Sequence, residues 1–367
     1  TFFSITYLNL LRGINMTKKL LPTMIGALLV GGMAAAQADV TVMGHIDTSV
    51  DAIDNDVTGL DDTNFNCTTC SVGFKGSEDL GNGLKAIFKI DFQYDTTERN
   101  TGKASAKSGS GFLTTPGGGS VTGQVVTSVS DTSSITDRDQ WLGLAGNFGQ
   151  VRVGTISTLY KSHGAMIDPL YRTALQGRTH GIQSQYFHAG AGEELQGRAT
   201  NTVRYDSPSW NGLKAGAHFT LDGDEGDDED DNPYGVGVSY ENGGILVFGD
   251  YVNNNQSGND EVNAWKLGGK YTLNNFAVMG QYESAEVGGN EPQFYHLGAS
   301  YTMGNNLLYA AYGIEDTDIS GEDDWTGWTV AGIHKMSKRT SVYAGYNARD
   351  FDGPDATQFS VGMKHKF

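Results

Sequence analysis

The sequence is poor in the features that mark several common classes of protein. Its two cysteines and seven prolines in 367 residues are too few for a disulfide-rich scaffold or a proline-rich stalk. Acidic residues outnumber basic ones, 43 to 25, and the net charge of −18 argues against a nucleic-acid-binding protein. No run after residue 38 is apolar enough to cross a bilayer as a helix. Glycine is abundant, with 51 residues, and this composition favours a β-rich protein over a helical bundle.

A single long apolar run, residues 20–36, lies near the N-terminus. Lys18 and Lys19 precede it and Ala36-Gln37-Ala38 ends it, a pattern typical of a secretory signal peptide. The alternative is a buried helix or an N-terminal anchor. We expect a signal peptide at residues 16–38 and an upstream extension at residues 1–15.

Along the rest of the chain, apolar and polar residues alternate, as strands with two unlike faces require. Residues 84–95, for example, place Lys85 and Lys89 on one face and mostly apolar or aromatic side chains on the other. Both a soluble barrel or sandwich and a transmembrane barrel would produce this alternation. Tyrosines and tryptophans near the ends of these stretches favour a transmembrane barrel, with its apolar face toward lipid and its charged face toward a lumen.

The connections between these stretches fall into two length classes. Tight turns such as Leu80-Gly81-Asn82-Gly83 suit the positive φ angles of hairpins. The longer polar links are residues 52–69, 96–137, 157–198, 222–233, 253–261, 285–293, 315–325 and 350–356. Eight long links imply about sixteen strands. The fold class predicted for residues 39–367 is therefore all-β: one transmembrane, antiparallel up-and-down β-barrel.

Two local features suggest further sites. Cys67 and Cys70 have no second pair and no neighbouring histidine, so in an exported protein a local disulfide is favoured over a metal site. The acidic run at residues 222–231 lacks the ligand spacing of an EF-hand, which favours a solvated external loop. The alternative there is loose binding of Ca²⁺ or Mg²⁺ that bridges to lipopolysaccharide. Its candidate ligands are Asp224, Asp227, Asp228 and Asp230. No other cofactor is expected.

Six stretches, spread over nearly the whole chain, are residues 71–86, 138–144, 148–154, 201–208, 336–340 and 361–367. They resemble, in order, the general porins of Gram-negative outer membranes, particularly the trimeric sixteen-strand family of proteobacteria. The resemblance implies a homotrimer in the outer membrane, in contact with lipid and lipopolysaccharide. It also implies that the C-terminal Phe367 is the signal read by the barrel-assembly machinery.

In that family the third long loop folds into the barrel and narrows the pore, and by order this loop is residues 157–198. The charged and histidine residues of this segment are Lys161, His163, Asp168, Arg172, Arg178, His180, Glu193 and Glu194. Strand alternation places Lys75, Lys85, Lys89, Arg152 and Arg204 on the lumen side. The candidate constriction and lumen-wall residues are Lys75, Lys85, Lys89, Arg152, Arg204, Asp168, Arg172 and Arg178. For any one of them the alternative is an ordinary solvated wall residue. Ser71 and Thr155 stand where relatives often carry arginine, so we expect weak charge selectivity and assign it no sign.

The sequence thus predicts a passive channel for ions and small hydrophilic solutes. A hydrolase built on a barrel would need a nucleophile with a positioned histidine, and neither G-x-S-x-G nor H-E-x-x-H occurs. A substrate-selective channel for sugars should line its lumen with aromatic residues, whereas here the aromatics are expected to face lipid. An adhesion barrel whose loops bind a partner is the third alternative.

Overall fold

The computed structural model describes residues 39–56, 58–97, 135–184, 197–221, 232–253, 262–287, 289–318, 324–350 and 355–367. The expected extension and signal peptide at 1–38 and the candidate ligands at 224–230 lie outside these residues. The strands are β1 Asp39–Asn55, β2 Leu60–Cys67, β3 Ser71–Gly81, β4 Leu84–Tyr94, β5 Ile135–Gly146, β6 Gly149–Ser157, β7 Arg198–Asp206, β8 Leu213–Thr220, β9 Tyr234–Asn242, β10 Ile245–Asn253, β11 Val262–Leu273, β12 Phe276–Val287, β13 Gln293–Met303, β14 Asn306–Asp316, β15 Trp325–Lys335, β16 Thr340–Asp350 and β17 Asp355–Lys366.

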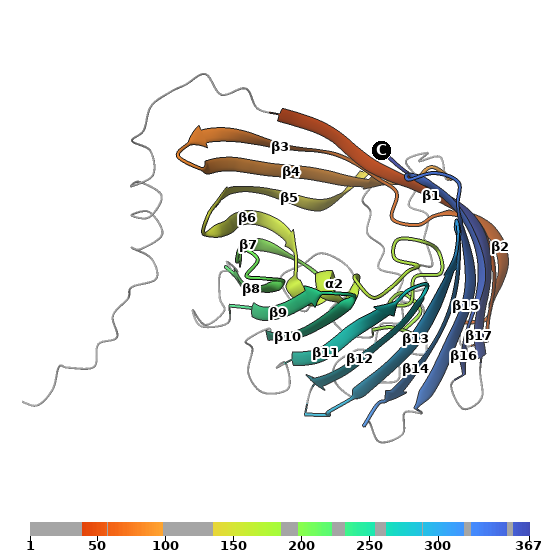
Figure 1. Cartoon of the computed structure of the whole chain (residues 1–367). Coiled ribbons are helices and arrows are strands. Elements are labelled where there is room, and N and C mark those ends of the chain that lie inside the picture. The colour runs from red at the N-terminus through yellow and green to blue at the C-terminus, as the bar shows by residue number, and fades with distance from the viewer. Residues whose placement is uncertain are drawn as a thin grey trace, which may run out of the picture.

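The strands form one closed antiparallel barrel (Figure 1). Each strand from β3 to β17 pairs with the next, and β17 returns to pair with β1 from His45 to Asn55. On its other edge, β1 pairs with β2 through its second half and with β3 through its first half. Because β2 and β3 share one place in the ring, the seventeen strands occupy sixteen positions. The predicted sixteen-stranded barrel is confirmed, and its closure through the pairing of β17 with β1 avoids the open edges that lipid does not tolerate.

Side-chain alternation along the strands has the predicted direction. On β17, Phe359, Val361 and Met363 point outward and are about half exposed, whereas Ser360 and Lys364 point inward and are buried. On β1, Val40, Val42 and Val50 are likewise exposed, whereas His45, Asp47 and Ser49 are buried. These strands therefore turn an apolar face outward and a polar face inward, the arrangement that suits a barrel in lipid. None of the helices in the described part of the chain has the length and apolar content needed to span a bilayer.

One predicted connection is wrong. Residues 52–69 are not a long link, because β1 continues to Asn55 and β2 begins at Leu60. The Asp-, Asn- and Thr-rich composition suggests a loop, but these residues pair with each other across a tight turn near Gly59, whose φ is +67°. The short turns are as predicted: Asn82 and Gly83, both with positive φ, close the hairpin of β3 and β4.

The segment after β6 lies inside the barrel (Figure 1). It begins with the short helix α2, Leu159–Gly164, whose N-terminus is capped by the Thr158 side chain. The following residues pack against the inner wall between β10 and β16. The buried apolar cluster there comprises Ile167, Leu170, Ala174, Leu175, Ile182, Leu246, Phe248, Ala277, Met279, Tyr309, Ala311, Ala331 and Tyr343. The expectation that aromatic side chains face lipid is thus wrong for Phe248, Tyr309 and Tyr343, which hold the loop in place.

Candidate functional site: a charged inner wall facing the loop

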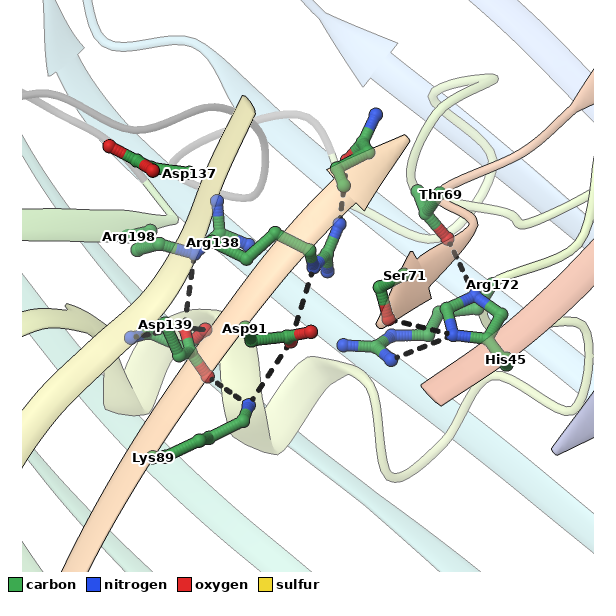
Figure 2. Close-up of polar contacts among 12 residues, drawn as sticks. His45, Thr69, Ser71, Lys89, Asp91, Asp137, Arg138, Asp139, Arg172 and Arg198 are labelled. Atoms are coloured by element: carbon green, nitrogen blue, oxygen red, sulfur yellow. Dashed lines mark hydrogen bonds and ion pairs between the residues drawn. The ribbon is translucent and has the colours of Figure 1, made fainter. Parts of the chain in front are cut away.

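Strands β4 and β5 carry a network of charged side chains on the inner wall (Figure 2). Lys89 Nζ lies 3.4 Å from Asp91 Oδ2 and 2.9 Å from Asp139 Oδ2. Arg138 joins from the other side, with its Nε 3.5 Å from the Asp91 carboxylate, while Arg198 Nε lies 3.0 Å from Asp139 Oδ1. Two carboxylates therefore bind and orient three cationic side chains in a largely water-excluded part of the wall.

A β-bulge brings Arg138 and Asp139 to the same face. The register between β4 and β5 shifts between Ile90, which pairs with Gln140, and Phe92, which pairs with Asp137. Consequently both Arg138 and Asp139 lie opposite Asp91, and both side chains reach the inner network. Bulges commonly redirect a side chain in this way near functional sites.

A second group of cations continues the network across β6 and β7. Asp206 binds both Arg152 and Arg204, with Arg204 Nη2 2.6 Å from Asp206 Oδ1. Ser157 connects the two groups, because its hydroxyl donates to Asp139 over 2.7 Å and its carbonyl accepts from Arg204. Lys89, Arg152 and Arg204, which alternation assigns to the lumen side, all take part in these contacts.

The loop adds cations that face this wall. Burial lowers the pKa of Lys161 well below its usual value, and the neighbouring Arg178, Arg198 and Arg138 lower it further. Arg178 and Arg172 both lie against the ring of Tyr171, with Cζ 4.5 Å and 5.6 Å from its centroid. The loop and the wall therefore bring several basic side chains close together.

Asp168 has a different environment from the other predicted residues. Its carboxylate accepts from the backbone N–H groups of Leu170 at 2.8 Å and Gly177 at 3.0 Å. Burial raises the pKa of Asp168, although these two hydrogen bonds and Arg178 oppose the shift. The carboxylate therefore stabilises the loop by bonding to a backbone group nine residues further along the chain, and Asp168 itself is almost fully buried.

His45 on β1 connects a third set of residues (Figure 2). Its Nδ1 lies 3.2 Å from Ser71 Oγ and 3.3 Å from the Arg172 guanidinium, and its Nε2 lies 3.3 Å from Thr69 Oγ1. Ser71, where relatives were expected to carry arginine, thus lies beside a guanidinium supplied by the loop. Cys67 and Cys70, which flank Thr69, are joined as a disulfide.

Polar contacts to the far wall anchor the loop in place. His163 Nδ1 lies 2.7 Å from Asp250, and Gln183 Nε2 donates to Gln281 Oε1 over 3.0 Å. Ser184 also donates to Glu283 over 2.5 Å. The loop is therefore held on two opposite sides of the barrel.

The remaining predicted residues lie away from this network. Lys75 and Lys85 are exposed, and the structure brings neither into the contacts described above. Phe367 exchanges two backbone hydrogen bonds with Gly44, and its ring packs over that glycine. Glu193 and Glu194 lie outside the described residues. Within the described ranges, no group of three or more His, Cys, Asp or Glu residues is arranged to hold a metal ion.

Sequence reasoning did not select Asp91, Arg138, Asp139, Arg198, Asp206 or His45 as site residues. Arg138, Asp139 and Asp206 lie within the stretches that resemble porins, so the resemblance was the available signal. Simple alternation could not assign them, because a bulge shifts the register beside Asp139.

A closed antiparallel barrel with an apolar outside, a charged inside and a loop packed into its interior defines a transmembrane β-barrel channel. The family model described as Gram-negative porin matches residues 23–354, and the chain belongs to that family. It is accordingly a porin channel of the outer membrane and not an enzyme, so the hydrolase alternative is wrong.

Individual relatives agree with this assignment. The major outer membrane protein P.IB of Neisseria sicca is 28% identical, with 96% of this chain and all of the relative aligned. Outer membrane porin protein 32 of Delftia acidovorans is 27% identical, over 93% of this chain and 91% of the relative. Among solved structures, an anion-selective porin from Comamonas acidovorans superposes with a TM-score of 0.66 at 20% identity, covering 90% of this chain and all of that one. A trimer form of OmpT of Vibrio cholerae superposes with a TM-score of 0.60 at 14% identity, covering 90% and 99%.

Proposed function

We propose that this porin is a homotrimeric, passive diffusion channel for ions and small hydrophilic solutes, with a weak preference for anions. The supporting observation is the concentration of cations between the inner wall and the loop. They are Lys89, Arg138, Arg152, Arg198, Arg204, Lys161, Arg172 and Arg178. The carboxylates among them are Asp91, Asp139, Asp206 and Asp168. An excess of positive charge in a narrow polar gap with low-dielectric walls enriches anions there.

The preference is weak because much of this charge is already neutralised. Asp139 is bound by Lys89 and Arg198, and Asp206 is bound by Arg152 and Arg204. The chain as a whole is also strongly acidic, which opposes the entry of anions from outside the gap. Two structures with the same fold, an anion-selective porin from Comamonas acidovorans and a trimer form of OmpT of Vibrio cholerae, are consistent with the proposal.

A planar bilayer with a salt gradient tests the proposal directly. We expect stepwise conductance, no saturable block by any single sugar, and a reversal potential shifted modestly toward that of the anion. Arg138→Gln should move this potential toward the cation value, whereas Lys85→Gln, outside the network, should change it less. A wild-type reversal potential on the cation side would contradict the anion preference. Saturable block by one solute would instead favour a substrate-selective channel.

The proposal extends to export and assembly. Residues 16–38 act as a signal peptide, so the N-terminal sequence of protein purified from outer membranes should begin at Asp39. Phe367 serves the barrel-assembly machinery, so deleting it should lower the amount of folded trimer in the membrane without changing the conductance of the trimers that form. Contact with lipid and lipopolysaccharide follows from the apolar outer face.

A further inference from the structure

The strand position shared by β2 and β3 is interrupted at residues 68–70, next to the cationic loop. Thr48 of β1 pairs with Cys67, and His45 pairs with Ser71, so two residues of β1 face three on the opposite strand. The disulfide between Cys67 and Cys70 closes this bulge. Cys70 is also tied to β1, because the Asp47 N–H donates to its sulfur over 3.3 Å.

Within the bulge, Thr69 has a backbone conformation that is unfavourable for a β-branched residue. Its φ is +52°, in the left-handed region that such residues rarely adopt. A conformation of this kind persists when its surroundings fix it, and the flanking disulfide supplies that constraint. The result is that Thr69 Oγ1 lies 3.3 Å from Nε2 of His45.

The contacts of His45 determine which of its ring nitrogens carries the proton. A guanidinium can only donate, so Nδ1, 3.3 Å from Arg172, must accept. The ring proton therefore lies on Nε2, where the Thr69 hydroxyl accepts it. Ser71 Oγ, 3.2 Å from Nδ1, supports the same arrangement as a second donor. His45 is almost fully buried, so the ring has little freedom to take another orientation.

From these contacts we infer that the disulfide-closed bulge positions Arg172 in the channel, acting through Thr69 and His45. The contact with Thr69 holds the ring through Nε2, and the lone pair at Nδ1 then holds one side of the guanidinium of Arg172. Arg172 itself has a left-handed backbone, with φ of +60°, and lies with Arg178 against Tyr171. The bulge is thus a positioning element for ion preference, and this inference rests on the proposed role of the cationic gap.

The test compares four variants by single-channel recording in a salt gradient. They are Cys67→Ser/Cys70→Ser, Thr69→Val, Arg172→Gln, and the cysteine pair combined with Arg172→Gln. Thr69→Val keeps the disulfide and side-chain shape while removing the acceptor, so it preserves the test if the serine pair does not fold. Thr48→Val is the matched control, because Thr48 lies opposite Cys67 but contacts Thr96 instead of His45.

We expect Arg172→Gln to lower the ratio of anion to cation permeability about twofold, as removal of one cation from the cluster should. The cysteine pair and Thr69→Val should shift the ratio in the same direction by at least half as much on a logarithmic scale. Thr48→Val should leave it unchanged. In the Arg172→Gln background, loss of the disulfide should add no further shift, because residues that act through one another are non-additive.

The outcomes separate the two proposals. If Arg172→Gln shifts the ratio but neither bulge variant does, the positioning role is refuted and the cationic gap survives. An additive effect of the cysteine pair in the Arg172→Gln background refutes it as well, because the bulge would then act elsewhere. If Arg172→Gln itself has no effect, both the positioning role and the proposed contribution of this loop cation fail.

Discussion

The ionisation of Tyr171 should make the ion preference of the channel depend on pH. Burial opposes ionisation of this phenol, but the guanidiniums of Arg178 and Arg172, together with Arg138, outweigh it and lower the pKa of Tyr171 to about 8. Tyr171 is neutral below this pH and negative above it. Lys364 approaches the same residue from β17, donating to the Tyr171 carbonyl over 2.5 Å. Raising the pH thus places a negative charge within a ring of cations.

The size of the effect follows from the titration curve. With a pKa of about 8, roughly a tenth of Tyr171 is ionised at pH 7 and roughly nine tenths at pH 9. The mean charge in the cluster therefore falls by about 0.8 between these values, which nearly offsets one of the three neighbouring guanidiniums. We expect the anion-to-cation permeability ratio to fall by about twofold over this range, similar to the loss of one cation.

The assay is the reversal potential in a fixed salt gradient at pH 7, 8 and 9. Tyr171→Phe is the matched control, because it keeps the ring between Arg172 and Arg178 and removes only the ionisable hydroxyl. Burial also lowers the pKa of the nearby Lys161, so the diagnostic quantity is the difference between wild type and Tyr171→Phe. If both proteins show the same change with pH, the assignment to Tyr171 is wrong.

Three further predictions concern charge, closure and packing. Asp206→Asn removes the shared partner of Arg152 and Arg204, so it should raise the anion preference measured by the reversal potential. It should also lower the free energy of unfolding in urea by about 3 kcal/mol. An unchanged reversal potential would show that these cations do not influence permeation. Gly44→Ala would place a methyl group 2.7 Å from the Phe367 ring and 2.2 Å from the Ser71 carbonyl. The folded barrel should therefore unfold at a lower temperature than wild type when heated samples are run on gels. Equal heat resistance would argue against this closure contact. Leu175→Ala opens a cavity beneath the loop, so it should lower the free energy of unfolding by about 2–5 kcal/mol and increase the current noise of the channel. Leu267→Ala, on the exposed outer face, should leave the noise unchanged. Equal noise in the two variants would refute the anchoring role of the cluster.

The barrel was predictable because its signal is repeated along the chain. An apolar outside and a polar inside impose a period of two on every strand, and an error in one strand does not alter the class. Residues 52–69 illustrate the limit: Asp61, Asp62 and Asn64 have low strand propensity, yet they pair with β1 because their backbone groups complete the ring. The composition of this segment is that of a loop, whereas closure of the sheet gives its backbone a strand conformation.

The charged wall could be predicted only in part, for a related reason. Alternation assigned Lys89, Arg152 and Arg204 to the inner face because each lies in a regular strand segment. It could not place Arg138 and Asp139 together, since adjacent residues in a regular strand point to opposite faces. Their joint contact with the β4 side chains requires the register shift at Asp91, and that shift depends on how β4, which ends at Tyr94, pairs with β5, which begins at Ile135.

The loop interior was hardest to predict because its contacts join distant parts of the sequence. In the sequence, Asp168 has the features of a pore-lining carboxylate. In the fold it is buried, accepts hydrogen bonds from two backbone N–H groups and so stabilises the loop. Arg172 reaches His45 on the first strand, 127 residues earlier, and Ser71 Oγ lies near the same ring nitrogen. The loop thus brings a cation beside this part of the wall, which the sequence of the strands alone does not reveal. On the proposed function, the ion preference of this channel should therefore depend on where the loop places its arginines as well as on which residues the strands carry.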